Sequence, residues 1–350
     1  MKIVGCDFHP SYQQVAVFDT STGEIEEFKL KHSDGQAERF YLALPGPALI
    51  GMEATGNSLW FERLVENLGH ELRVGDAAQI RASYVRKQKT DKRDAGHILK
   101  LLLEDRFPKI WVPNQQQRDV RQLLVHRHKL VQVRTRLKTE LQHLALNLGV
   151  QKKRQLWNLK GRAELESLPL EGWTRQRRED LLALLRVVEP QVEQLDKAVE
   201  QAAGANAKAQ LLMSQPGIGP ITALAFVMTI GEVSRFQRSK QVSSYLGLIP
   251  SEHSSGNKRK LGSISKQGNV FLRTLLVEAA QSAVRHDPQL RKEYQHRCHH
   301  MAKGTAKVAT ARKLAVRLYW MLKTSKPYPE VLLIEGSPRH PVAAKANPSC

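Results

Sequence analysis

Cysteine is scarce in this 350-residue sequence: Cys6, Cys298 and Cys350 are the only three, and they lie far apart. This spacing gives no disulfide framework and fits a reducing cytoplasm. No apolar run reaches membrane-spanning length, and the N-terminus opens on a strand pattern rather than a signal peptide. Aromatic residues make up 6% and charged residues 25% of the chain, which predicts a soluble globular protein of two or three domains.

Charge is distributed unevenly along the chain, whose formal net charge is +20. Residues 1–105 contain 13 Lys and Arg against 16 Asp and Glu, whereas the remainder contains 41 against 18. An acidic first third before a strongly basic remainder is typical of a catalytic head on a nucleic-acid-binding body. Because basic proteins also bind nonspecifically, charge defines the class of partner and nothing finer.

The first third predicts a mixed α/β domain. Three strands follow one another closely, as in an antiparallel meander, and strands and helices then alternate. This order is that of the ribonuclease-H-like fold. The expected strands span residues 2–7, 14–18, 25–30, 48–53 and 71–74, and the expected helices span residues 35–44 and 57–69, with a later helix bearing Asp91 and Asp94.

Four carboxylates occupy the places where this fold carries its acids. Asp7 ends the first strand, Glu53 ends the fourth, and Asp91 and Asp94 share one helix face. Carboxylates converging from separate elements suit two magnesium ions about 4 Å apart beside a phosphodiester. Each acid alone has an ordinary explanation, as a solvated helix face, a turn residue or a cap, but the ordered set favours metal binding. Basic residues beside the pair suit a phosphate backbone: Lys89, Lys92 and Arg93.

The middle of the chain, from Pro113, predicts long basic helices. Leu123, Leu130, Leu137 and Leu144 repeat at heptad spacing, with Leu141 and Leu148 filling the stripe and Arg127 and Arg134 interrupting it. Residues 181–199 repeat the pattern, and Pro190 inside them is expected to kink or restart that helix. Residues 151–178 are interpreted as a basic connector. The expected products are an antiparallel helical pair, dimerisation, or both.

The last third opens on the turn Gln215–Pro220. Its Pro-Gly-Ile-Gly sequence resembles a helix-hairpin-helix element, in which Gly217 and Gly219 would let backbone N–H groups approach DNA phosphates. An ordinary helix–helix turn is the alternative. Apolar helices are expected at residues 221–230 and 241–247, followed by a polar loop at 248–269 and a helix from Val270 to Arg285.

The polar loop combines small residues with cations that suit a DNA strand lying close to the backbone. A serine hydroxyl in it could attack phosphorus, although most serine-rich loops are inert. The clustered His296, Cys298, His299 and His300 share one expected helix and lack a second ligand pair, so a zinc site is rejected. Residues 337–350 are interpreted as a frayed tail. The loop cations are Lys258, Arg259, Lys260 and Lys266.

Taken in order, these motifs resemble the DEDD transposases of the insertion-sequence one-ten family, which includes the Piv pilin-gene invertase and the bridge-RNA-guided recombinases. The resemblance runs from about residue 1 to 325. The motifs that carry it are Gly5–Asp7, Gly51–Gly56, Thr90–Ala95, Pro216–Gly219 and Tyr245–Pro250 through Ser254–Gly256.

The resemblance implies an α/β plus all-α architecture in four parts. Residues 1–112 would form a RuvC-like catalytic domain and residues 113–205 a basic coiled-coil linker for dimerisation. Residues 206–328 would form a mostly helical transposase domain with a catalytic serine, and residues 329–350 a disordered tail.

The resemblance also implies a chemistry. Asp7, Glu53, Asp91 and Asp94 would bind Mg²⁺, with Mn²⁺ as a substitute, and Ser255 would attack a DNA phosphate to form a phosphoserine link. Ser254 beside it stays an alternative nucleophile. The metal site would come from another protomer, so that a homo-oligomer, a dimer at the minimum or a tetramer, completes the site.

The implied partners are donor and target double-stranded DNA and a noncoding guide RNA, in the bacterial cytoplasm with the nucleoid. The function expected is a DNA transposase or site-specific recombinase of a mobile insertion sequence. A RuvC-like structure-specific nuclease that uses water as its nucleophile, or a Piv-type DNA invertase, is the alternative. A nonenzymatic nucleic-acid-binding protein would leave the four ordered carboxylates unexplained.

Overall fold

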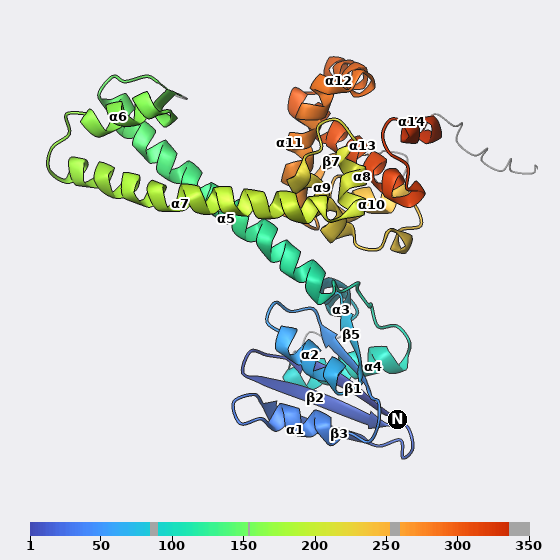
Figure 1. Ribbon diagram of the computed structural model, residues 1–350. Coiled ribbons are helices and arrows are strands. Elements are labelled where there is room, and N and C mark those ends of the chain that lie inside the picture. Colours follow the sequence, from blue (N-terminus) through green and yellow to red (C-terminus); the bar gives the residue numbers. More distant parts are fainter. Residues whose placement is uncertain (85–89, 153–154, 253–259, 336–350) are drawn as a thin grey trace, which may run out of the picture. The chain divides into compact units, whose positions relative to one another are not determined.

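A computed structural model describes residues 1–84, 90–152, 155–252 and 260–335. The chain divides into two compact units, Met1–Val112 and Pro113–Cys350, and each is described by itself (Figure 1). The division of the second part into linker, transposase domain and tail stays a prediction. No helix in the described ranges is both long and apolar enough to cross a membrane.

The first unit is built on a five-stranded mixed sheet in the order β3-β2-β1-β4-β5. The central β1 is antiparallel to β2 and parallel to β4, so the predicted meander and the alternating order that follows it are confirmed. The strands are β1 (Lys2–Phe8), β2 (Tyr12–Asp19), β3 (Ile25–Lys31), β4 (Leu49–Glu53) and β5 (Glu71–Gly75).

Helices cover both faces of this sheet, which explains why β1 and β4 are nearly continuous apolar runs. On one face Tyr41 of α1 (Gln36–Leu42) and Phe61 of α2 (Leu59–Asn67) pack against the strands. On the other face lie Ala95 and Leu99 of α4 (Asp91–Leu103). A short helix that the sequence pattern did not predict, α3 (Ala77–Ala82), begins at Asp76, whose side chain accepts a hydrogen bond from the Gln79 N–H.

The second unit begins with an antiparallel pair of 33-residue helices, α5 (Gln115–Asn147) and α7 (Gly172–Gly204) (Figure 1). Polar contacts fix the direction of the pair. Arg127 of α5 donates to Asp196 of α7 at 2.7 Å, and Arg177 near the start of α7 donates to Glu140 at 3.1 Å. Arg127, expected to interrupt the apolar seam, is therefore paired with an acid of the facing helix. The buried seam consists of Leu137, Leu141, Leu144, Leu181, Leu182, Leu185, Val188 and Val192.

The structure departs from the predicted helical stripe at three places. Leu148 is 41% exposed because α5 ends one residue before it. Near the start of α5, Leu124 is buried and Leu123 is partly buried, and both pack on the core of the later helices. Helix α7 continues through Pro190, so the expected restart there is wrong, while a kink stays a prediction. Proline removes one backbone hydrogen bond, and the burial of Val188 and Val192 against α5 offsets that loss.

Residues 151–178 are more regular than a connector. They include the 3₁₀ turn η1 (Gln155–Trp157), α6 (Leu159–Ser167) and the first two turns of α7. Asn158 caps α6 by accepting a hydrogen bond from the Gly161 N–H at 2.8 Å. Leu156 and Leu165 are fully buried in a small core with Ala145. The high charge of this stretch hid the few apolar positions that order it.

The remaining helices pack around α9 (Pro220–Ile230), an almost wholly buried helix. Helices at 221–230, 241–247 and 270–285 were predicted and are confirmed. The elements around α9 are α8 (Ala207–Met213), η2 (Val233–Arg235), α10 (Ser239–Tyr245), α11 (Val270–His286), α12 (Pro288–His300), α13 (Lys303–Thr324) and α14 (Glu330–Glu335).

Two further expectations for this region were wrong. The polar loop at 248–269 contains two short antiparallel strands, β6 (Pro250–Glu252) and β7 (Leu261–Ile264). The tail expected from residue 329 begins with α14, where Val331 is fully buried against the core.

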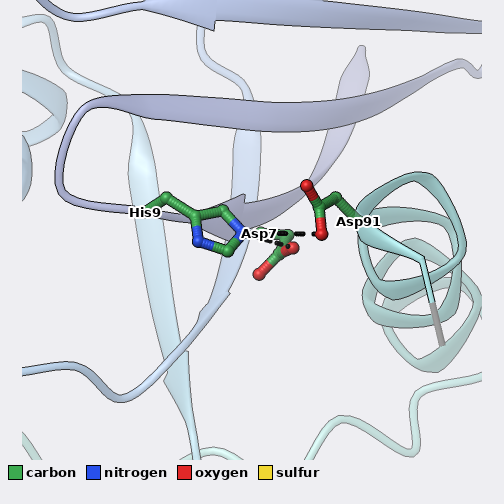
Figure 2. A group of neighbouring side chains, drawn as sticks. All are labelled: Asp7, His9 and Asp91. Carbon is green, nitrogen blue, oxygen red and sulfur yellow. Dashed lines mark hydrogen bonds and ion pairs between the residues drawn. The ribbon is translucent and has the colours of Figure 1, made fainter.

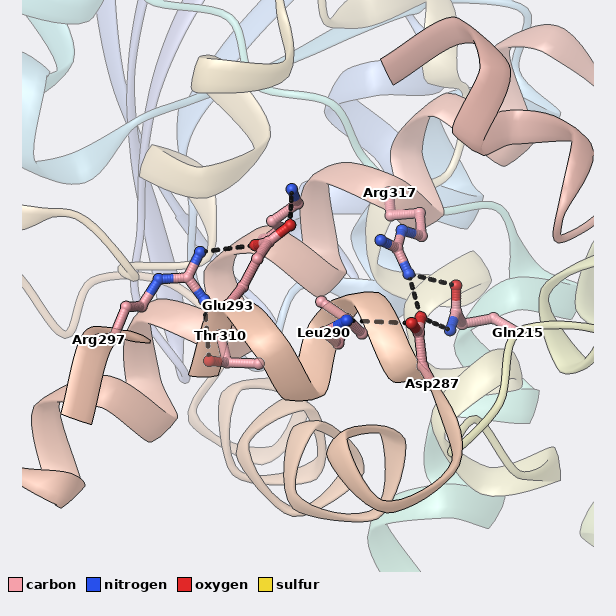
Figure 3. A network of polar contacts seen from close by, with 8 residues as sticks. Gln215, Asp287, Leu290, Glu293, Arg297, Thr310 and Arg317 are labelled. Atoms are coloured by element: carbon pink, nitrogen blue, oxygen red, sulfur yellow. Dashed lines mark hydrogen bonds and ion pairs between the residues drawn. The ribbon is translucent and has the colours of Figure 1, made fainter. Parts of the chain in front are cut away.

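A buried ion pair joins three elements of this core (Figure 3). Arg317 of α13 donates to Asp287 at 2.6 Å and to Gln215 at 3.3 Å, and both charged side chains are fully buried. Asp287 also caps α12 by accepting from the Leu290 N–H. Removing one partner of such a pair typically costs about 3–5 kcal/mol. The pair therefore fixes the turn at Gln215 against α12 and α13.

Candidate functional site

Asp7 and Asp94 come together because α4 lies directly on β1. A side chain at Gly5 would place its Cβ 2.3 Å from the Ala95 carbonyl oxygen and 2.5 Å from the Leu99 nitrogen. Only glycine allows this approach, which explains the glycine two residues before Asp7. Asp94 is 6% exposed in the first turn of α4.

Asp7, His9 and Asp91 form a cluster of possible metal ligands (Figure 2). One ligand atom from each lies within 4.8 Å of the other two. His9 Nε2 lies 3.1 Å from Asp7 Oδ2 and 3.8 Å from Asp91 Oδ1. The Tyr12 hydroxyl donates to Asp91 Oδ2 at 2.7 Å. The Tyr12 ring stacks on the His9 ring, with centroids 4.6 Å apart. Strand β2 thus orients an acid of α4.

Asp94 is oriented by a second tyrosine. The Tyr84 hydroxyl donates to Asp94 Oδ1 at 2.6 Å, and its ring lies 4.1 Å from that of His97. His97 Nε2 is in turn 2.8 Å from the Ser83 hydroxyl. This chain of contacts ties the segment after α3 to α4. It holds Tyr84, and through it Asp94, in one orientation.

Glu53 ends β4 at the same sheet edge as Asp7. The strands are parallel and pair Cys6 with Met52, so the residues that follow them leave the sheet side by side. Burial and the hydrogen bond to Asp94 raise the pKa of Tyr84, and the charges of Asp94, Asp7 and Glu53 raise it further. Three of the four predicted acids therefore act on one hydroxyl.

Negative charge gathers around the carboxyl of Asp7. Burial raises the pKa of its carboxyl, His9 opposes this increase, and Asp94 and Asp91 add to it. Clustered carboxylates repel one another, and hard divalent cations prefer carboxylate oxygens. The residues present therefore fit such an ion: Asp7 and Asp91 supply oxygens, with Glu53 and Asp94 beside them.

Two of the three basic residues predicted beside this site lie within the described residues. Lys92 is exposed, and its Nζ lies 3.4 Å from Glu27 Oε2. Arg93 is exposed on the first turn of α4, where the Thr90 side chain caps the helix. Lys89 lies outside the described residues. Their contact with nucleic acid stays a prediction.

The turn before α9 uses its two glycines differently. Gly217 has a φ of +88°, and a Cβ there would lie 2.4 Å from the Ala283 nitrogen of α11. Its packing alone explains that glycine. Gly219 is exposed at the N-cap of α9, with open space around it. The first N–H groups of a helix lack internal partners, and contact between Gly219 and a DNA phosphate stays a prediction.

The predicted serine segment is described only at its ends. Ser254, Ser255, Lys258 and Arg259 lie outside the described residues. The strands on either side of them are tied together, since the Ser251 hydroxyl donates to the Ser263 carbonyl at 3.1 Å and the Ser265 N–H donates to the Ile249 carbonyl at 2.8 Å.

The base of the same hairpin is held from α11. Arg273 is buried and donates to the carbonyls of Leu246 and Gln267, at 3.1 and 2.7 Å. Lys260 and Lys266, at the near and far sides of β7, are both exposed. The frame around the serine segment is thus ordered structure with cations on its surface.

Sequence reasoning missed His9, Tyr12, Tyr84 and His97. His9 and Tyr12 follow Asp7 closely, so their nearness to the acid was a usable signal. Tyr84 and His97 reach the site only through the packing of the segment after α3 on α4. Nothing in their spacing indicates it.

Comparison with known sequences identifies the family of this chain. A family model described as "Transposase IS116/IS110/IS902 family" matches residues 209–295, and a model of DEDD transposases, described as "Transposase", matches residues 4–148. The chain is 30% identical over 292 residues to the "Probable family 20 transposase" of Pseudomonas aeruginosa, which covers 81% of this chain and 84% of that protein. The chain belongs to the IS116/IS110/IS902 family of transposases and is an enzyme that acts on DNA.

Two other relatives show the range of this likeness. The "Transposase for insertion sequence element IS1111A" of Coxiella burnetii is 29% identical, over 82% of this chain and 79% of its own length. The "Pilin gene-inverting protein" of Moraxella bovis is 26% identical, over 79% of this chain and 80% of its own length. The DEDD domain of the family is RuvC-like, and such enzymes generally use divalent metal ions.

Proposed function

We propose that this transposase cleaves and exchanges DNA strands at the carboxylates of Asp7, Glu53, Asp91 and Asp94, with Mg²⁺ as the ion. The observation that carries the proposal is the convergence of acids from β1, β4 and α4, with tyrosines orienting two of them. A divalent cation held there supplies positive charge beside a phosphodiester. Mn²⁺ is expected to substitute, because it accepts the same oxygen ligands.

The nucleophile in this proposal is Ser255, with Ser254 as the neighbouring alternative. Its oxygen would form a bond to phosphorus while a sugar oxygen leaves, and the hydroxyl proton would be lost as the leaving oxygen gains one. Serine is a weak nucleophile at neutral pH without a base or a nearby positive charge. The acids and the serine lie in different units, so the proposal includes a composite site in which one protomer supplies the acids and another the serine.

A homo-oligomer is part of the same proposal. Helix α7 exposes three large apolar side chains that do not belong to its buried seam with α5. Trp173 is 89%, Leu184 53% and Val187 59% exposed. Exposed apolar side chains of this size suit contact with a second copy of the chain. We infer a dimer as the minimum, and a tetramer would supply four serines for four strands.

Guidance by a noncoding RNA is proposed on the family resemblance and on charge. Residues from 106 onward contain 41 Lys and Arg against 18 Asp and Glu, a balance that suits RNA as well as DNA. A Piv-type invertase is the second candidate, favoured by the likeness to the "Pilin gene-inverting protein". Both functions would use the same residues and differ in the arrangement of the sites they join.

The proposal is tested by strand exchange between plasmids that carry the element's ends and its target. Ser255→Ala should abolish exchange while DNA binding stays within about twofold, because the hydroxyl contributes chemistry rather than affinity. Ser254→Ala is the matched control and should exchange at a normal rate. If only Ser254→Ala is inactive, the nucleophile is Ser254. If both variants exchange strands normally, the serine mechanism is wrong and water becomes the nucleophile, as in a structure-specific nuclease.

A further inference from the structure

Helices α11, α12 and α13 border a cavity of about 200 Å³ that takes no part in the chemistry proposed above. Ala280 and Val284 form an apolar floor, and Tyr294 of α12 supplies an aromatic wall. Gln281, Arg285 and Lys307 add one amide and two cations. Pockets that hold drug-sized ligands have volumes of about 300–1,000 Å³. This smaller cavity suits a single flat ring.

The walls of the cavity are fixed by their own hydrogen bonds. Thr310, at its edge, is buried, donates to the Ala306 carbonyl at 2.9 Å and accepts from Arg297 at 3.2 Å. Figure 3 shows Arg297 also binding Glu293, which pairs with Lys313 at 2.6 Å. The cavity is therefore a built feature.

The cavity also lies in a strongly basic segment. Residues 280–313 contain eight Lys and Arg against Asp287 and Glu293. Both acids are already paired, Asp287 with Arg317 in the core and the partly exposed Glu293 with Arg297 and Lys313. Arg285 and Lys307 take part in no ion pair among the residues that the structure describes, and Arg285 is exposed. Cations at the rim of an apolar, aromatic-walled hollow match a phosphate joined to a base.

We propose that this cavity binds one unpaired nucleotide of a single-stranded nucleic acid. The base lies on the apolar floor against Tyr294, the Gln281 amide meets its polar edge, and Arg285 and Lys307 bind its phosphate. The inference rests on the proposed function, because strand exchange and an RNA guide are the sources of unpaired nucleotides. DNA and RNA share this chemistry, and the test distinguishes them.

The test uses the full-length protein and fluorescent single-stranded oligomers of DNA or RNA that carry 5-iodouracil. After irradiation, mass spectrometry maps the cross-linked peptides, and fluorescence anisotropy measures affinity. We expect a cross-link at Tyr294. The double variant Arg285→Gln/Lys307→Gln should reduce that cross-link about tenfold, whereas Lys292→Gln, which removes an exposed charge of α12 outside the cavity, should leave it unchanged. Thermal melting confirms that both variants fold.

Each outcome decides between the alternatives. A cross-link formed with RNA alone assigns the cavity to a guide strand. A cross-link formed with DNA alone assigns it to a displaced DNA strand. Cross-links with both show that the cavity accepts an unpaired nucleotide of either kind. If the oligomer binds but cross-links only elsewhere, or if Lys292→Gln loses as much signal as the double variant, the cavity is no nucleotide site while the proposed function stands. If no single strand binds at all, the guide and strand-exchange proposals fail with it.

Discussion

The acid site and the serine segment are built in contrasting ways. The acids extend from β1, β4 and α4, and backbone pairing and tyrosine hydrogen bonds fix where they meet. The serine segment lies between two strands of three and four residues, and what the structure describes is its frame, held by Arg273 and the β6–β7 contacts. The acid site brings together several carboxylates whose charges repel, and tyrosine hydrogen bonds hold two of them in place.

The largest effect should come from the acid site. Asp94→Asn keeps the size of the side chain and removes its charge, so strand cleavage should fall about a thousandfold or more, equivalent to about 4 kcal/mol. Cleavage rates measured at a series of Mg²⁺ concentrations test this. Glu66→Gln, an exposed change on α2, is the control. If Asp94→Asn cleaved as fast as Glu66→Gln, Asp94 would not belong to the site.

The turn before α9 tests the second region through its two glycines. Gly217→Ala should lower the free energy of unfolding by about 2–5 kcal/mol, because it adds a Cβ at positive φ against α11. Gly219→Ala has open space and should lower the stability by less, about 1 kcal/mol or below, because alanine is a poorer N-cap than glycine. Urea denaturation measures both. Equal stability of the two variants would refute the packing role of Gly217, and normal DNA affinity of Gly219→Ala would argue against a phosphate contact.

Tyr84 and Tyr12 offer a finer comparison within the acid site. Tyr84→Phe keeps the ring on His97 and removes the hydrogen bond to the buried Asp94, so the rate and the Mn²⁺ affinity should each fall about tenfold. Tyr12→Phe should have a smaller effect, because Asp91 is more exposed. Titration calorimetry with Mn²⁺ gives a readout independent of activity. Unchanged metal affinity in Tyr84→Phe would refute its orienting role.

The smallest effect concerns the helical pair that separates the two kinds of site in the sequence. Burial of Glu189 opposes its ionisation, but hydrogen bonds from Arg162 and Lys138 outweigh this and lower its pKa below the usual 4.5. A carboxyl whose pKa is lowered on folding stabilises the fold above about pH 4.5, and this contribution is lost as the pH falls through its folded value.

Glu189→Gln should therefore cost about 1 kcal/mol at pH 7 and nothing near pH 3. Urea unfolding at the two pH values measures the difference. Glu193→Gln, an exposed change one turn further along α7, should cost little at either pH. A penalty for Glu189→Gln that is equal at both pH values would show that the ion pairs contribute nothing.

The sequence predicted the order of strands and helices along the first unit, because each element follows from short-range periodicity. The approach of Asp7 to Asp91 and Asp94 was expected from the ribonuclease-H-like order of those elements. The sequence could not predict Tyr84 and His97, whose positions depend on how α3 and the segment after it pack. The expected restart of the helix at Pro190 was wrong for a related reason. Proline disfavours a helix interior, but the buried seam beside Pro190 outweighs that local preference. The β6–β7 strands and α14 were missed because each depends on contacts made after folding.

The central claim is that a serine of one unit and the acids of the other act on one phosphodiester. The most direct measurement is a search for the covalent link. The full-length protein is incubated with Mg²⁺ and DNA carrying the element's ends, then denatured, digested and analysed by mass spectrometry. The account predicts a nucleotide joined to the peptide that contains Ser255, present in the native protein and absent in Asp94→Asn. Magnesium-dependent cleavage of DNA with no such adduct would contradict it.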